Sequence, residues 1–416
     1  MSPSSRPLAH SPMPPLIRRG MRRVVAFALV GLAAAIAAPS RAAEPEETIK
    51  VGLIVELSGG FAAQAKQMVN GARAYIKAHG DHVAGKKIEL IVKDVGGPAP
   101  DVAKRLAQEL VTRDKVQFLA GFVLTPNALA VAPVATEAKV PTILMNAATS
   151  IITTKSPYIA RVSFTLPQVT APLAEWAARN NLKRVYTLVS DYGPGNDAEA
   201  TFKKVFAAHG GQVVGSVKVP LKSPDFSPFI QRIKDASPEA VFIFVPGGEA
   251  SISFMKAFTE RGLRQAGIKL IGTGDLTDDD ALPAMGDTAL GVISTHHYSA
   301  AHRSPANDAF KKAYADVAGP GVRPNFMAVG GWDGMHVIYE VARKLAGKPG
   351  APIGGDAAMA IIKGMSIDSP RGTITIDAAT RDVVQDVYVR KVEKVGGQVF
   401  NVEFDTIAKV KDPGKP

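Results

Sequence analysis

Small polar residues gather where several short apolar runs of the sequence end. These loops are Ser58-Gly59-Gly60, Gly121 to Asn127, Asn146 to Ser150, Asp191-Tyr192-Gly193, Pro246-Gly247-Gly248 and Gly272-Thr273-Gly274-Asp275. Small residues let a ligand approach the backbone, and hydroxyls together with the free N–H groups at helix starts suit a carboxylate. One such residue is more often a helix cap, but together the loops predict a pocket for a small carboxylate.

Catalytic motifs are missing from the sequence. It contains no G-x-S-x-G elbow, no phosphate-binding G-x-x-x-x-G-K-S/T loop, no H-E-x-x-H and no G-x-G-x-x-G. His296-His297, with His302 nearby, could suggest a metal, but adjacent histidines on a strand point to opposite faces. One of the pair is therefore expected to be buried and the other exposed. Asp278-Asp279-Asp280 is predicted to be a solvated turn and helix cap. We expect no metal, no cofactor and no catalysis.

The loops need a scaffold, and the sequence between them alternates short apolar runs with amphipathic stretches. The strand-like runs are Ile49–Leu57, Ile88–Lys93, Val116–Ala120 and Thr142–Met145, and the helix-like stretches are Gln64–His79, Asp101–Arg113 and Asn127–Ala138. Strands that are apolar throughout are typical of a sheet buried on both faces. The alternation predicts an α/β unit with a parallel sheet flanked by helices. Ligands bind beyond the carboxyl ends of such strands.

The same alternation then starts again. Strand-like runs are Arg184–Val189, Val213–Val219, Ala240–Val245, Lys269–Gly272 and Gly291–Thr295, and helix-like stretches are Val169–Asn180, Asp197–His209, Phe229–Asp235 and Ala250–Gly262. A second α/β unit of similar size is therefore expected.

The end of the chain has a different pattern. Helical stretches at Pro305–Val317, Asn325–Leu345 and Asp356–Met365 precede the alternating runs Gly372–Ile376, Asp386–Lys394 and Gln398–Phe404. Gly396-Gly397 predicts a hairpin turn. Trp332 and Tyr339 are at helical spacing and are predicted to pack in the core or between the two units. The mixed ending indicates that the chain crosses between the units more than once.

The N-terminus has the pattern of a secretory signal. Arg18, Arg19, Arg22 and Arg23 precede an apolar run from Val24 to Ala38, and small residues follow it. The run is shorter than the roughly 20 residues that span a bilayer. We therefore expect residues 1–42 to be cleaved, and the mature protein to begin near Ala43 and to be a soluble monomer in the periplasm.

Charge and cysteine content exclude several classes of protein. The formal net charge is +11, but six of the 49 basic residues lie before residue 44, which leaves 43 against 38 acidic residues. Aromatic residues make up only 6% and no dense basic patch is present, so nucleic-acid binding is not expected. The absence of cysteine excludes disulfides, thiolate metal sites, thiol nucleophiles and a lipid-modified N-terminal cysteine.

The order and spacing of several short motifs resemble one known family. The motifs are Ile49-Lys50-Val51-Gly52-Leu53, Leu57-Ser58-Gly59-Gly60, Asn70-Gly71-Ala72, Pro141 to Thr149, Ser190-Asp191-Tyr192-Gly193, Phe226-Ser227 and Gly286-Asp287 with Gly291. Together they resemble the leucine/isoleucine/valine-binding proteins, the type I periplasmic binding proteins of hydrophobic amino acid ABC transporters. The likeness extends from about Thr48 to Phe404.

The resemblance implies a two-lobed α/β fold with three crossovers that close like a hinge. Lobe one would comprise residues 47–167 plus 299–370, and lobe two residues 168–298 plus 371–413. The partners it implies are an inner-membrane ABC permease and its ATPases.

The resemblance also implies roles for particular residues. The family's carboxylate-binding positions match Thr125, Ala147 and Thr149, and the aromatic residue that closes over the ligand matches Tyr192. Gln64 stands where an aromatic platform is expected. Gly274 stands where the family places the acid that pairs with the ligand's ammonium, with Asp275 one place along. The full set of candidate ligand-binding residues is Gln64, Thr125, Pro126, Asn127, Ala147, Ala148, Thr149, Tyr192, Gly247, Asp275 and Tyr298.

The differences from the family pattern at Gln64 and Gly274 bear on which ligand is bound. Without the acid at position 274, an amine-free carboxylate is favoured, such as an aromatic acid or an aryl or branched 2-oxo acid, because a buried unpaired ammonium is costly. Pro126, Phe61 and Phe122 could supply apolar walls. If Asp275 replaces the missing acid, the chain would bind a branched-chain or other hydrophobic amino acid instead. A ligand-sensing receptor of the same fold and a periplasmic hydrolase are further alternatives, disfavoured by the export signal and by the missing catalytic residues respectively.

Overall fold

The first sheet is built from the apolar runs of the N-terminal half. The computed structural model describes residues 47–222, 225–346 and 353–415, so the predicted signal segment, residues 1–42, lies outside the described residues. The strands of this sheet are β1 (Thr48–Val55), β2 (His82–Val83), β3 (Lys86–Asp94), β4 (Phe118–Gly121), β5 (Thr142–Leu144) and β6 (Ile159–Arg161). Their order is β2-β3-β1-β4-β5-β6, and all pair in parallel except β2 with β3. The predicted parallel unit is therefore confirmed, and the two short strands β2 and β6 were not predicted.

Helices α1 (Ala62–His79), α2 (Pro100–Thr112) and α3 (Thr125–Ala138) alternate with these strands. Two short 3-10 turns, η1 (Gly59–Phe61) and η2 (Ser150–Lys155), follow β1 and the loop after β5. Two prolines fix the starts of helices in this unit, because proline lacks the N–H that a first helical turn leaves unpaired: Pro100 begins α2 and Pro126 lies in the first turn of α3.

The second sheet combines parallel and antiparallel strands. Its parallel part consists of β7 (Arg184–Ser190), β8 (Gln212–Val219), β9 (Ala240–Phe244), β10 (Lys269–Thr273) and β11 (Ile293–His296), and its antiparallel part of β12 (Ser366–Ser369), β13 (Gly372–Ile376), β14 (Val383–Val395) and β15 (Gln398–Val410). The order is β12-β13-β14-β11-β10-β9-β7-β8, and β15 pairs with β14. The turn at residues 396–397 joins β14 to β15 as predicted.

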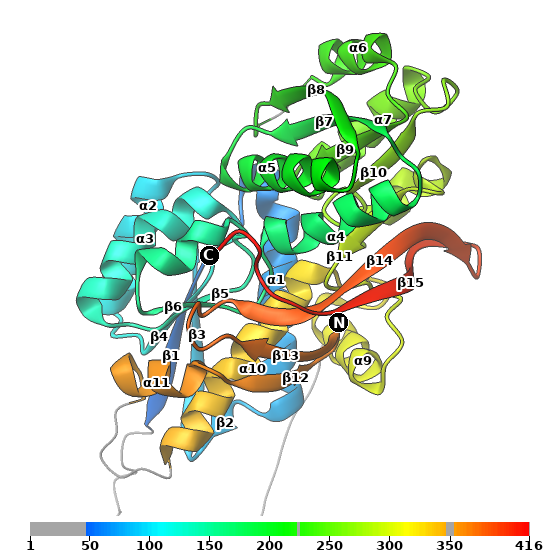
Figure 1. The fold of residues 1–416 in the computed structure, drawn as a ribbon. Coiled ribbons are helices and arrows are strands. Elements are labelled where there is room, and N and C mark those ends of the chain that lie inside the picture. Colours follow the sequence, from blue (N-terminus) through cyan, green and yellow to red (C-terminus); the bar gives the residue numbers. More distant parts are fainter. Residues whose placement is uncertain (1–46, 223–224, 347–352, 416) are drawn as a thin grey trace, which may run out of the picture. The chain divides into compact units, whose positions relative to one another are not determined.

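The helices of the second half are α4 (Leu166–Arg179), α5 (Gly193–Ala208), α6 (Ser227–Ala236), α7 (Glu249–Glu260) and α8 (Leu282–Met285), with the 3-10 turn η3 (Gly286–Ala289). They are followed by α9 (Pro305–Ala318), α10 (Phe326–Ala346) and α11 (Gly355–Ile362). Figure 1 labels these helices on the ribbon, except for the short α8 and η3.

Helix α10 returns the chain to the first unit by packing directly against α1. Glycines make this close approach possible: a Cβ placed on Gly71 would lie 1.9 Å from the backbone oxygen of Ala328, and one on Gly331 would lie 2.1 Å from that of Met68. Trp332 and Tyr339 of α10 are buried, as predicted. Figure 1 shows α10 alongside α1. Helices far apart in sequence therefore share one core.

Candidate ligand-binding site

Two threonines from neighbouring loops form the centre of the candidate site. Thr125 begins α3 and Thr149 lies in the loop after β5, and their Oγ1 atoms are 3.0 Å apart. Both side chains are buried. Gly193, the first residue of α5, lies against them, because a Cβ placed on it would be 2.7 Å from Thr149 Oγ1. Two hydroxyls thus meet a helix N-terminus from the second sheet, an arrangement suited to a carboxylate.

The N-terminus of α3 already has a hydrogen-bond acceptor of its own. Glu56, which follows β1, accepts hydrogen bonds from the N–H groups of Val123 and Leu124 at 3.1 and 3.2 Å and from Asn127 Nδ2 at 2.6 Å. Its side chain is fully buried, and this burial raises its pKa to about 7 although the three donors oppose the shift. A ligand carboxylate would therefore depend on the threonine hydroxyls and α5 more than on the first N–H groups of α3.

Two of the predicted polar contacts are used inside the protein. Asn127 bonds to Glu56 and to the Gly97 carbonyl, and its Oδ1 accepts the N–H of Ala99 at 3.0 Å. The N–H of Ala147 donates to the Phe122 carbonyl at 2.9 Å. Both residues support the Thr125 and Thr149 loops, so of the predicted polar groups on this side the two threonine hydroxyls are left to contact a ligand.

A second contact between the two sheets' loops involves Gln64. Its Nε2 donates to the carbonyl of Gly247, which follows β9. Gly248 has a φ of +83°, and a Cβ there would lie 2.6 Å from Gln64 Nε2, so this turn favours glycine both conformationally and sterically. Beside the contact is a pocket of about 270 Å³. Its lining comes from the loops after β1, β3, β8 and β9, and includes Gly59, Phe61, Gly97, Leu221, Pro246 and Gly247.

Tyr192 and Asp275 follow β7 and β10 on the second sheet. The Tyr192 ring stacks on Phe244 with centroids 6.0 Å apart. Burial raises the Tyr192 pKa well above its usual value, and the charge of Asp275 adds to this shift, so the phenol keeps its proton. Asp275 Oδ2 accepts a hydrogen bond from Thr273 Oγ1 at 2.9 Å. A phenol donor and a carboxylate acceptor therefore both occur at this end of the sheet.

Position 274 has no room for any side chain. A Cβ placed on Gly274 would lie 2.3 Å from Arg390 Nη2 and 2.3 Å from Cδ2 of His296. Arg390 is 1% exposed and is held by Ser294 Oγ and the Tyr298 carbonyl. The family resemblance places an acidic side chain at position 274. In this protein the side chains of Arg390 from β14 and His296 from β11 occupy that space.

The remaining candidates are Tyr298, Ala148 and Pro126. Tyr298 is fully buried, and its hydroxyl donates to Asn307 Oδ1 at 3.1 Å. The Ala148 carbonyl accepts the N–H of Leu166 at 3.0 Å, while Pro126 is half-buried in the first turn of α3. Ligand contact by these three residues stays a prediction.

Two expectations about polar residues were wrong. His296 and His297 are both fully buried, because β11 lies between β10 and β14 while the Phe164 ring covers both imidazoles. The aspartate run is also not solvated. Asp278 and Asp279 are each 2% exposed and bond to the amides of Asn325 and Asn401 respectively. This burial depends on side chains more than 40 residues away in the sequence. The pattern of neighbouring residues therefore could not predict it.

Glu56 and Arg390 were missed. Glu56 directly follows the apolar residues 51–55, and this was an available signal in the sequence, whereas Arg390 lies among other charged residues of β14 and had no such signal.

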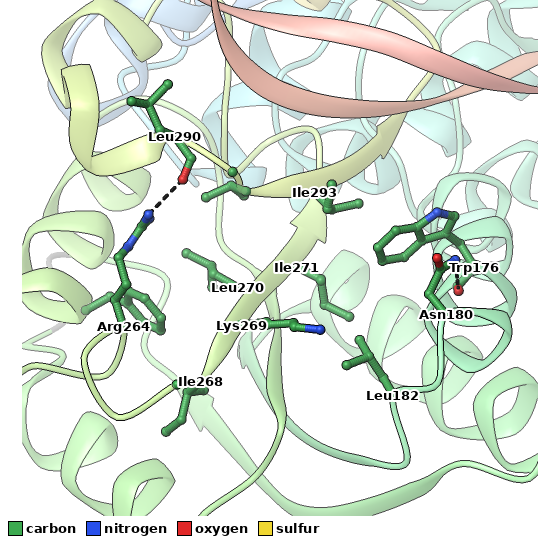
Figure 2. A pocket seen from close by; sticks show the side chains of 14 residues that line it. Trp176, Asn180, Leu182, Arg264, Ile268, Lys269, Leu270, Ile271, Leu290 and Ile293 are labelled. Carbon is green, nitrogen blue, oxygen red and sulfur yellow. Dashed lines mark hydrogen bonds between the residues drawn. The ribbon is translucent and has the colours of Figure 1, made fainter.

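A larger pocket lies elsewhere on the second sheet. Its volume is about 350 Å³, and residues around the amino ends of its strands, such as Leu182, Ile268 and Lys269, contribute to its lining. Figure 2 shows Arg264 in this pocket directed at the Leu290 carbonyl, to which it donates at 2.8 Å. Ligands of parallel sheets bind at the opposite, carboxyl ends, so we do not assign this pocket to the site.

The two α/β sheets and the polar residues at the carboxyl ends of their parallel strands are typical of a solute-binding protein. The family model described as "Periplasmic binding protein" matches residues 48–398. The chain belongs to this family, the type I periplasmic binding proteins of ABC transporters. Over the residues that the structure covers in detail, no helix is long and apolar enough to cross a membrane.

Solved and curated relatives extend this assignment. A solute-binding protein of an ABC transporter from Rhodopseudomonas palustris BisB5, crystallised with 3,4-dihydroxy benzoic acid, is 56% identical, with a TM-score of 0.85 over 89% of this chain and 100% of that one. Another from Rhodopseudomonas palustris HaA2, in complex with p-hydroxybenzoic acid, is 44% identical, with a TM-score of 0.85 over 88% and 99%. The Leu/Ile/Val-binding protein homolog 6 of Brucella melitensis is 44% identical over 88% of this chain and 94% of that one.

Proposed function

We propose that this protein captures an aromatic carboxylic acid of the hydroxybenzoate class in the periplasm and presents it to an ABC permease for import. The observation that carries the proposal is the buried pair of Thr125 and Thr149 hydroxyls beside the N-terminus of α5. Relatives at 56% and 44% identity are bound to hydroxylated benzoic acids, which supports the same ligand class here.

The region around position 274 favours an amine-free ligand. The Arg390 guanidinium lies where the ammonium-pairing acid would be, and it is a fixed positive charge in a buried setting. An α-ammonium placed beside it would meet like charge as well as desolvation. A neutral aromatic ring avoids both costs.

Hydrophobic amino acids are the second candidate. Asp275 is a nearby carboxylate that can pair with an ammonium, and curated relatives carry the name Leu/Ile/Val-binding protein homolog. The same fold also occurs in ligand-sensing receptors, which is why transport itself needs a separate test.

A thermal-shift and calorimetry series separates the ligand classes. The series contains 4-hydroxybenzoate, 3,4-dihydroxybenzoate, phenylglyoxylate, 4-methyl-2-oxopentanoate and leucine. A ligand at a hundredfold its dissociation constant stabilises by about 2.7 kcal/mol, and we expect this from the hydroxybenzoates. Stabilisation by leucine with none from the aromatic acids would refute the proposal. Uptake of labelled acid by cells with and without the gene tests the transport role.

A further inference from the structure

Two adjacent histidines present buried ring nitrogens without hydrogen-bond partners. His296 ends β11 and His297 follows it, and neither side chain is exposed to solvent. Within the described part of the chain, none of their four ring nitrogens has a hydrogen-bond partner. Buried polar atoms are almost always paired. Four unpaired atoms at the carboxyl end of a central strand therefore point to a polar group that comes from outside the chain.

A carboxylate and two aromatic rings lie around His296. Asp275 Oδ2 is 3.7 Å from His296 Nε2, which is beyond hydrogen-bond distance. The rings of Phe164 and Phe326 lie with centroids 4.7 and 4.5 Å from the imidazole. The polar atoms of Asp275 and His296 therefore lie next to the rings of Phe164 and Phe326. Such a combination suits an aromatic ligand that bears a polar substituent.

The charge state of His296 favours a hydroxyl partner. Burial lowers the His296 pKa to about 4 although Asp275 opposes the shift, and the nearby Arg390 charge adds to the lowering. The ring is therefore neutral at pH 7, with one donor and one acceptor nitrogen. The described residues contain no group of three or more His, Cys, Asp or Glu side chains able to hold a metal. A hydroxyl, which both donates and accepts, matches a neutral imidazole beside a carboxylate.

The separation between the strands fits a single ring. In the order β7-β9-β10-β11, Gly193 follows β7 and lies against the threonine pair, while Asp275 follows β10 and His296 ends β11. Two to three strand spacings are roughly 10 to 14 Å. Hydrogen bonds of about 2.8 Å at each end leave roughly 4 to 9 Å between the ligand's end atoms. A benzene ring with para substituents fits this range, whereas the carboxylate and ammonium of an α-amino acid are closer together.

We infer that Asp275 and His296 form a hydroxyl-recognising pair that selects aromatic acids with a ring hydroxyl opposite the carboxylate. The ring hydroxyl donates its one proton to the Asp275 carboxylate and accepts a hydrogen bond from the N–H of the neutral His296 ring. This inference rests on the proposed function, since it requires the carboxylate to lie at Thr125 and Thr149. It adds the requirement for a hydroxyl, which the threonine pair alone does not impose.

Calorimetry with benzoate and 4-hydroxybenzoate tests the pair. The wild-type protein should bind 4-hydroxybenzoate at least about tenfold more tightly than benzoate, because benzoate leaves the polar pair buried without a partner. Asp275→Asn and His296→Gln should each reduce this ratio to within about threefold. A purely structural role for either residue would weaken both acids equally and leave the ratio unchanged.

The outcomes separate the two proposals. Equal wild-type affinity for benzoate and 4-hydroxybenzoate, or an unchanged ratio in both variants, overturns the hydroxyl-recognising pair but leaves the aromatic-acid function intact. Binding of leucine with no binding of any aromatic acid overturns both. If His296→Gln does not fold, the wild-type ratio together with Asp275→Asn still decides the matter.

Discussion

Thr149→Val is the substitution that most directly tests the carboxylate anchor. It keeps the shape of the side chain but removes the hydroxyl that lies 3.0 Å from Thr125 Oγ1 and next to α5. A hydrogen bond to a charged group contributes about 1.5–3 kcal/mol. The dissociation constant for 4-hydroxybenzoate should therefore rise by roughly 10- to 150-fold.

Titration calorimetry of the purified protein measures this change, and circular dichroism checks the fold. Thr170→Val is a matched control, because Thr170 is also buried and its Oγ1 has no hydrogen-bond partner among the described residues. The control should bind within about twofold of wild type. An unchanged affinity in Thr149→Val, with the fold intact, would refute the reasoning that the threonine pair holds the carboxylate.

Three further outcomes follow from the structure. Gly274→Ala should destabilise the protein by about 1–3 kcal/mol in urea unfolding, since a Cβ there lies 2.3 Å from its neighbours; unchanged stability would contradict the packing described. His296 stays neutral in the folded protein down to its pKa of about 4, while the unfolded residue protonates near 6.5, so its own contribution to stability should fall by roughly 3 kcal/mol as pH drops from 6.5 to 4. The raised pKa of Glu56 acts in the opposite direction over the same range, so the quantity to measure is the difference between wild type and His296→Gln. His296→Gln should remove the His296 contribution, and an identical pH profile would count against the shifted pKa. Gln64→Ala removes the bond to the Gly247 carbonyl and should weaken ligand binding about 2- to 10-fold, with a smaller ligand-induced decrease in radius of gyration by X-ray scattering; equal affinity would show that this bond does not support the bound form.

The parallel sheets could be predicted because their signal is local. Runs such as Ala240–Val245 are apolar throughout, and the turn residues between them mark the ends of strands. Strand β9 is accordingly buried at every position. The short strands β2 and β6 escaped prediction because two or three residues carry too little pattern to distinguish a strand from a loop.

The candidate site was predictable in part. Thr125 and Thr149 could be identified because they follow strands of one sheet, whose carboxyl ends meet at one edge. The burial of His296, His297 and Asp278 could not, because it depends on Phe164, Asn325 and other partners that are distant in sequence. The internal use of Asn127 was equally hidden, since it depends on where Glu56 places its carboxylate.

The packing around Gly274 limits the order in which mutations could change the ligand preference of this protein. An acidic side chain at 274 needs the space that His296 and Arg390 now fill. Moving Arg390 first would break its bonds to Ser294 and to the Tyr298 carbonyl. A substitution that is harmful in the present background would become acceptable only after other residues had changed. Because of this epistasis, several coordinated substitutions, rather than one, separate this protein from proteins of the same fold that carry an acid at the equivalent position.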